Sequence, residues 1–130
     1  MRRSRGLALL CSAYVLVGCG ASAKQQVQAK VQQFARATAA KQVHTLCTQV
    51  LAPALVARLT AAGISCDQAM RIFVGSVTDP TLTVAKITVN GNRASAVVRA
   101  GASGQPSSVE RIELIQTGNG WRLASLASPT

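Results

Sequence analysis

The sequence of 130 residues is poor in the side chains on which most enzyme chemistry depends, with one histidine, four acidic residues and four aromatic residues. A single histidine excludes the His-Glu-x-x-His zinc motif, which needs two. No Gly-x-Ser-x-Gly nucleophile turn, phosphate-binding loop or dinucleotide-binding fingerprint occurs either. These absences exclude the common motif-defined hydrolases, metalloproteases and nucleotide-dependent enzymes.

A hydrophobic run long enough to cross a membrane is also missing, because the apolar segment 7–17 is shorter than the about 20 residues required. The segment follows a basic start and precedes small residues, as in a secretory signal peptide. Its end, Leu16-Val17-Gly18-Cys19, resembles the bacterial lipobox. The resemblance implies export, removal of residues 1–18 and acylation of Cys19, with palmitate among the acyl chains. We therefore expect an extracytoplasmic lipoprotein anchored to the cell membrane; the alternative is an uncleaved anchor helix.

Basic residues exceed acidic ones, with fourteen Lys and Arg against four Asp and Glu. Eleven of the fourteen follow the leader, so the expected mature chain carries a charge of +7. They form neither a run nor a stripe along one helix face, and only three aromatic residues accompany them, so nucleic-acid binding is not predicted. We interpret the charge as solvation, with attraction to anionic lipid headgroups of about 1 kcal/mol per nearby cation. Residues 19–22 would form the acylated cysteine and tether, and 23–127 a single domain.

The four cysteines have separate predicted roles. Cys11 lies in the leader and Cys19 is the expected acylation site, which leaves Cys47 and Cys66. In an oxidising compartment these two are expected to form a disulfide, which for a loop of this length contributes about 3 kcal/mol.

A metal site is the alternative use of the same region. His44 and Cys47 are three residues apart on one predicted helix, and Cys66 and Asp67 add two more potential zinc ligands. No short Cys-x2-Cys pair is present, and an oxidising compartment removes free thiols. We therefore favour the disulfide, with His44 as a bystander, over a zinc site or a Cys-His nucleophile, and predict neither metal nor cofactor.

The first half of the sequence predicts four helices. Ser22 and Gln25 have capping-box spacing ahead of an amphipathic helix over 23–39. A short helix is expected over 43–50, and a third between Pro53 and a glycine stop at Gly63. A fourth should begin after Ser65. The buried stripe of the first helix is predicted to contain Val27, Val31, Phe34, Ala35 and Thr38.

The second half predicts strands. Segments 82–89 and 93–100 flank Asn90-Gly91-Asn92, and an Asn-Gly pair is a strong hairpin signal. Segments 109–116 and 121–126 form a second predicted hairpin around 117–120. Helices followed by a strand meander predict an α+β domain, with N-terminal helices packed on a curved antiparallel sheet of about four strands.

This order of elements resembles the cone-shaped α+β roll of the nuclear transport factor 2-like (cystatin-like) superfamily, and small bacterial lipoproteins with that domain in particular. The resemblance spans about residues 22–126. It depends on the Val27-Val31-Phe34 helix, the Cys47…Leu59…Gly63…Cys66 pattern, the strand and turn from Val84 to Gly91, and Gly120-Trp121-Arg122-Leu123. It implies a cavity between helices and sheet, which some members use for catalysis or ligands and others do not.

Few residues are candidates for catalysis. Steroid-isomerising members of the superfamily use an aspartate base and a tyrosine, but the only tyrosine here, Tyr14, lies in the leader. Glu110 alternates with Ile112 and Leu114, so it could face the interior and act as a base; alternatively it is a rim carboxylate near arginine. Trp121 could stack on a ligand, although a core position is favoured.

The preferred interpretation is a non-catalytic, membrane-anchored extracytoplasmic lipoprotein that binds a partner protein or a small apolar ligand. Two alternatives stay open: an enzyme with Glu110 as base, and a binder of anionic envelope polymer. The sheet is expected to line the core or cavity with Ile87, Val89, Ala96, Val98, Ile112, Leu114, Trp121 and Leu123. Small residues there would leave space that no helix fills.

Overall fold

A computed structural model describes residues 21–126 and 128–129. The expected leader and the acylation site Cys19 lie outside this range and stay predictions. Among the described residues, no helix has the length and hydropathy needed to cross a membrane.

The first helix, α1 (Ala23–Ala39), begins and ends close to the predicted positions. Its capping box is confirmed, because the Ser22 hydroxyl accepts from the Gln25 amide while the Gln25 side chain accepts from the Ser22 amide. The buried face differs in one position from the prediction, since Ala37 is buried and Ala35 is only half-buried. The reason is that the C-terminal turn of α1 packs between the sheet and the other helices.

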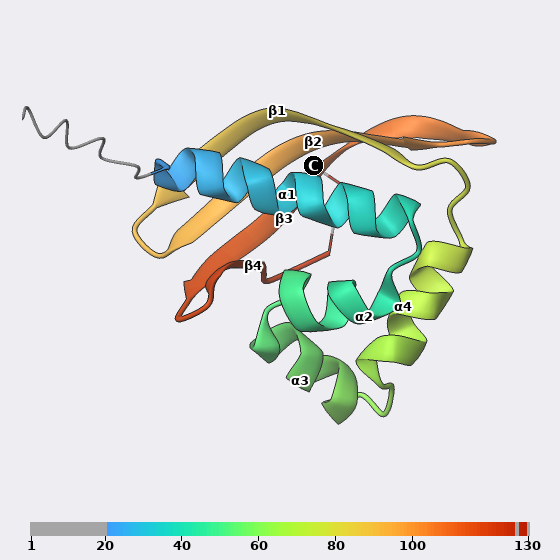
Figure 1. Cartoon of the computed structure of the whole chain (residues 1–130). Coiled ribbons are helices and arrows are strands. Elements are labelled where there is room, and N and C mark those ends of the chain that lie inside the picture. The colour runs from blue at the N-terminus through green and yellow to red at the C-terminus, as the bar shows by residue number, and fades with distance from the viewer. Residues whose placement is uncertain (1–20, 127, 130) are drawn as a thin grey trace, which may run out of the picture.

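Four further helical elements follow α1 (Figure 1). The expected second helix is split into a single turn, α2 (Val43–Thr45), and a π-helix, η1 (Leu46–Val50). Next come α3 (Pro53–Ala61), with proline at its start, and α4 (Cys66–Gly75), capped by Ser65. The glycine stop is confirmed: Gly63 and Ile64 donate to the last carbonyls of α3, at Thr60 and Leu59.

The predicted disulfide is confirmed. It joins Cys47 in η1 to Cys66 at the start of α4, with 5.9 Å between the Cα atoms. Both sulfurs are consumed by this bond, so the alternatives that needed a thiolate, the zinc site and the Cys-His nucleophile, lose their ligand or nucleophile.

The sheet is antiparallel, with the order β1-β2-β3-β4 and a short β5 paired to β3. The hairpin at Asn90-Gly91 is confirmed, with Gly91 at φ +61°. The strand β3 begins earlier than predicted, because a tight turn at Ser103-Gly104 extends the β2–β3 ribbon through segment 101–108, which lies between the predicted strands 93–100 and 109–116. The strands are β1 (Thr81–Asn90), β2 (Arg93–Ala102), β3 (Gln105–Thr117), β4 (Gly120–Leu123) and β5 (Ser128–Pro129).

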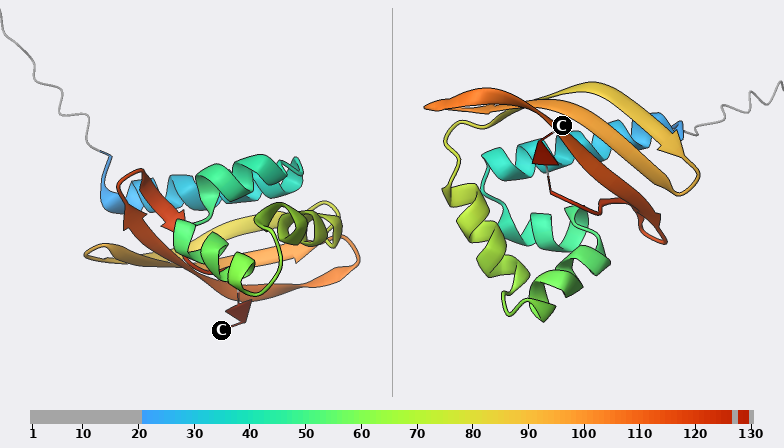
Figure 2. Two further views of the ribbon diagram at one scale, coloured as in Figure 1. Left: turned by 90° about the horizontal axis from the view of Figure 1, so that it is seen from below. Right: turned by 180° about the vertical axis from the view of Figure 1, so that it is seen from behind.

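The core lies between the helices, mainly α1, η1 and α4, and one face of the curved sheet (Figures 1 and 2). The paired residues Ile87, Ala96 and Ile112 form one buried row across three strands. Val27 and Val31 of α1 are fully buried in the same core. The structure thus confirms the predicted class, an α+β roll of helices on a curved antiparallel sheet. The fourth strand ends at Leu123, earlier than expected, where the Leu123 carbonyl accepts from the Ala52 amide.

Candidate functional site

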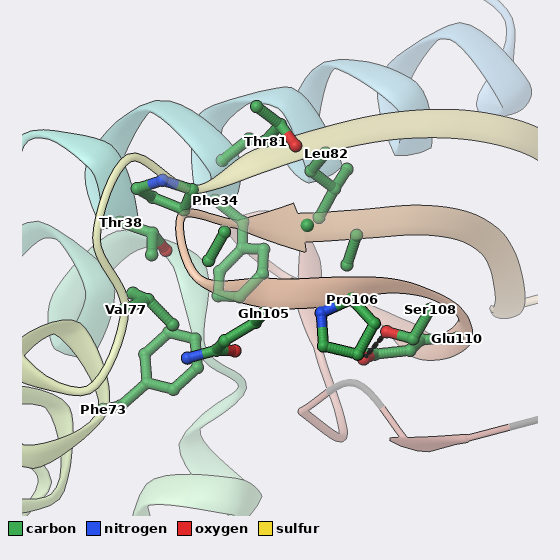
Figure 3. Close-up of a pocket in the computed structure, with 15 residues that line it drawn as sticks. Phe34, Thr38, Phe73, Val77, Thr81, Leu82, Gln105, Pro106, Ser108 and Glu110 are labelled. Atoms are coloured by element: carbon green, nitrogen blue, oxygen red, sulfur yellow. Dashed lines mark hydrogen bonds between the residues drawn. The ribbon is translucent and has the colours of Figure 1, made fainter.

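A pocket of about 150 Å³ lies beyond the end of the core, between the C-terminal half of α1, α4 and the ends of β1, β2 and β3 (Figure 3). At this end the β2–β3 ribbon continues past the end of α1 (Figure 1), and helical side chains line the space without filling it. Its lining comprises Phe34, Ala35, Thr38, Phe73, Val77, Pro80, Thr81, Leu82, Ala100, Gly101, Ala102, Gln105, Pro106, Ser108 and Glu110.

Most of this lining is apolar. The rings of Phe34 and Phe73 stack with their centroids 6.0 Å apart and their planes 19° apart, which joins α1 to α4. Leu82 and Pro106 come from the strands (Figure 3). A concave, mainly apolar site with a few polar groups is the usual form of a small-molecule site.

Three polar side chains contribute most to the chemistry of the pocket. Glu110 is half-buried, and its Oε1 accepts a hydrogen bond of 2.6 Å from Ser108 Oγ. Thr38 is 5% exposed, and its hydroxyl has no hydrogen-bond partner among the described residues. The Gln105 side chain donates to the Ser76 carbonyl over 3.3 Å, which links the ribbon to the end of α4.

Glu110 is therefore on the interior face of the sheet, as its alternation with Ile112 and Leu114 predicts. Glu110 is only half-buried and its hydrogen bond to Ser108 is exposed, so the alternative of a rim carboxylate also fits its position, with Ser108 rather than an arginine as the described partner of its side chain. Among the lining residues Glu110 is also the one titratable side chain.

The residues predicted to line a cavity do not line this pocket. Seven of the eight are buried core residues, and Val89 packs half-buried against them, so this expectation holds for the core and is wrong for the described pocket. The space beside Ala94 and Ala96 is occupied by α1. Trp121, 3% exposed, is likewise part of the core rather than a ligand-stacking ring. The eight residues that the structure places in or against the core, and not in the pocket lining, are Ile87, Val89, Ala96, Val98, Ile112, Leu114, Trp121 and Leu123.

Sequence reasoning missed Phe73, Pro80 and Pro106 as pocket residues. No local pattern marks them as neighbours, because they come from a helix, a loop and a strand that meet only in the folded chain. Phe73 alone had a signal, as an apolar residue on the buried side of α4.

Two cations, one on α1 and one on β4, have a structural role. Lys30 Nζ donates to the Gln49 carbonyl over 3.0 Å, and Arg122 Nη1 donates to the Thr48 carbonyl over 2.9 Å. They thereby satisfy carbonyls at the C-terminal end of η1, which a helix cannot pair internally. Burial, and then the nearby charge of Arg122, lowers the pKa of Lys30.

Three other cations meet on the outer face of the sheet. Lys86 and Arg111 both pair with Val97 from opposite sides, and Arg99 lies two residues further along β2. Standard strand spacings place their Cα atoms about 8–10 Å apart. All three are exposed, and none has a side-chain hydrogen bond or ion pair within the described part of the chain. The expectation of dispersed charge is therefore wrong for this group, which we call the basic face (Lys86, Arg99 and Arg111).

Comparison with solved structures supports the fold described above. No protein-family model and no curated protein sequence matches the chain. A crystal structure from Streptomyces avermitilis, described as a candidate dehydratase of the nuclear transport factor 2-like family, superposes with a TM-score of 0.54 at 18% identity. The match covers 82% of this chain and 95% of that one. A de novo designed protein of the same fold gives a TM-score of 0.52 at 12% identity, with coverage of 85% and 90%. At these identities the likeness concerns the backbone alone, and the chain described here has the nuclear transport factor 2-like fold.

Proposed function

We propose that this chain is a non-catalytic lipoprotein domain, anchored on the extracytoplasmic side of the cell membrane through Cys19, that binds a small, mainly apolar ligand in the pocket between α1, α4 and the strand ends. The observation that supports this most is the pocket itself, apolar along Phe34, Phe73, Leu82 and Pro106 and polar at only a few points. Such a lining favours burial of a hydrophobic molecule while the polar groups fix its orientation.

The composition of the lining favours binding over catalysis. Acid–base catalysis usually needs a positioned base and a second group that stabilises the charge developing on the substrate. Glu110 is the one titratable residue in the lining, which includes no histidine, tyrosine, lysine or arginine. A carboxylate without such a partner is better suited to orienting a ligand.

The decisive experiment is native mass spectrometry of the lipoprotein, extracted gently from its own membranes. The polypeptide mass tests the removal of residues 1–18, acylation of Cys19 and the two-hydrogen loss of the disulfide. A stoichiometric adduct beyond the anchor supports ligand binding. A clean lipidated monomer contradicts it and favours a protein partner instead.

A matched pair of variants locates the adduct. Ala100→Leu adds three carbons to the pocket lining, and Ala85→Leu makes the same change at an exposed position of β1. The adduct should disappear from the first variant and persist in the second. Far-ultraviolet circular dichroism of both variants checks that each retains its fold. Persistence of the adduct in a folded Ala100→Leu variant would place the ligand elsewhere.

An enzyme with Glu110 as base is the second candidate, favoured by the position of that carboxylate in the pocket and by the description of the Streptomyces neighbour. It predicts that Glu110→Gln abolishes turnover while folding is unchanged. The same loss in Glu113→Gln, on the outer face of the same strand, would contradict a specific role for Glu110.

Binding of an anionic envelope polymer is the third candidate, and the basic face is the observation that favours it. The probe is long-chain inorganic polyphosphate. Three contacts, at about 0.7 counterions released per contact on a flexible polyanion, give a slope near −2 for log affinity against log salt. Changing all three cations to Gln should remove this slope. Changing Lys24, Arg36 and Arg71, which lie on helices, alters the net charge equally and should preserve most of it. Equal losses in both variants would show that net charge alone acts.

A further inference from the structure

From the pocket's polar groups we infer that its ligand is a small organic ammonium ion, with an apolar body of about the size of a benzene ring and the ammonium group against Glu110. This inference depends on the proposed binding function and specifies the chemical class of ligand. It is argued from the unused hydrogen-bonding capacity of Glu110 and Thr38 and from the apolar surface between them.

Glu110 has acceptor capacity to spare. An ionised carboxylate offers about four lone-pair positions, and the one described side-chain donor to it is the Ser108 hydroxyl. The chain is rich in cations, yet no described lysine or arginine is paired with Glu110. A half-buried carboxylate without a cation is a suitable partner for a cationic ligand group, because a charged donor strengthens the hydrogen bond.

Thr38 supplies the second, independent observation. Its side chain is buried, lines the pocket from α1, and has a hydroxyl without a described partner, although a helical threonine can bond the carbonyl four residues earlier. The hydroxyl oxygen is itself enclosed, so a ligand group pairs with it only where a neighbouring side chain moves aside, and Glu110 is the polar group that the ligand meets directly. Figure 3 places Thr38 and Glu110 on opposite sides of the pocket, with Phe34 between them.

The surface between these two groups suits an organic cation. The stacked rings of Phe34 and Phe73 present apolar area, and aromatic faces attract cations. A volume of about 150 Å³ is the size of an engineered cavity that binds benzene, so the body of the ligand is one ring or a branched alkyl group. The excess positive charge lies outside the lining, where salt screens it over about 8 Å.

The test compares four probes that share one ring: benzylamine, benzyl alcohol, toluene and benzoate. Each is titrated into the full lipoprotein in detergent, and protein-observed NMR of the backbone amides of residues 100–105 gives the dissociation constants. Because these amides lie in or beside the lining, partitioning of a probe into micelles does not mimic binding. Benzylamine should bind at least about tenfold more tightly than benzyl alcohol, the value expected of a charge-assisted hydrogen bond, and benzoate should bind most weakly.

Two charge-neutralising variants make the assignment specific. Glu110→Gln should bring benzylamine to the affinity of benzyl alcohol, whereas Glu113→Gln, three residues away on the exposed face, should leave the tenfold preference unchanged. If toluene and benzyl alcohol bind as tightly as benzylamine, the ammonium inference is wrong while the binding function stands. If none of the four shifts these amides, the pocket is not a ligand site and both proposals fail.

Discussion

Loss of the Cys47–Cys66 disulfide should lower the stability of the fold by about 3 kcal/mol. The bond closes a loop with a sequence separation of 19, and the chain-entropy model assigns about 3 kcal/mol to a loop of that length. For a domain of this size, that loss lowers the Tm by roughly 12 to 24 °C. The perturbation is made in two ways, by reduction with dithiothreitol and by the double substitution of both cysteines with alanine.

Comparing the two perturbations separates the stability that comes from the cross-link from the stability that comes from packing of the sulfur atoms. Reduction keeps both sulfur atoms, whereas alanine also removes the sulfur of Cys66, which is 8% exposed at the start of α4. Urea unfolding, monitored by circular dichroism in a background with C11A and C19A, gives the free energy of unfolding for each. The reduced chain should lose about 3 kcal/mol, and the alanine variant slightly more. A loss below about 1 kcal/mol on reduction would refute the loop-closure argument.

Loss of the disulfide should also destabilise α4, the helix that contributes Phe73 to the pocket. The helix α4 is joined to η1 by the disulfide and to α1 through the stacked Phe34 and Phe73 rings. With the cross-link broken, the amides of α4 should exchange hydrogen faster than those of β2 and β3, because local opening follows local stability. Equal acceleration in helix and strands would show that the bond acts on global stability alone.

Three further predictions concern single side chains. Thr38→Val removes an unpaired buried hydroxyl and should raise the free energy of unfolding of the ligand-free protein by about 1 kcal/mol in urea titrations; a loss would show that the hydroxyl is paired. Ser65→Ala removes the cap of α4 and should cost about 1 kcal/mol by the same assay, whereas Ser107→Ala, at an exposed strand position, should change little. Burial and the charge of Arg122 lower the pKa of Lys30 in the folded protein. Below that lowered pKa, the charged Lys30 amine destabilises the folded state. This cost disappears as the pH rises through the ordinary lysine pKa of about 10.4, at which the unfolded chain also loses the proton. The stability of Lys30→Gln minus that of the parent should therefore fall as the pH rises from neutral to above that value; a difference independent of pH would contradict the reasoning.

Local sequence signals determined most of the elements of this fold. The capping box at Ser22, the glycine after α3 and the Asn-Gly turn each involve only three to five consecutive residues, so each can be predicted from the sequence. The alternation of Glu110 with Ile112 and Leu114 likewise placed the carboxylate on the inner face, since side chains alternate along a strand. The disulfide followed from elimination among four cysteines.

The positions of the pocket and of the basic face depend on how the whole chain packs. The pocket depends on how far the β2–β3 ribbon extends past the end of α1, and its Phe34 and Phe73 are 39 positions apart in the chain. The basic face depends on strand register, which brings Lys86, Arg99 and Arg111 together although no two are close in sequence. Helices and strands form through short-range hydrogen bonding and hydrophobic periodicity, and both can be read from neighbouring residues. Sites form where helices and strands meet, and the meeting points are set by packing and strand register across the whole chain.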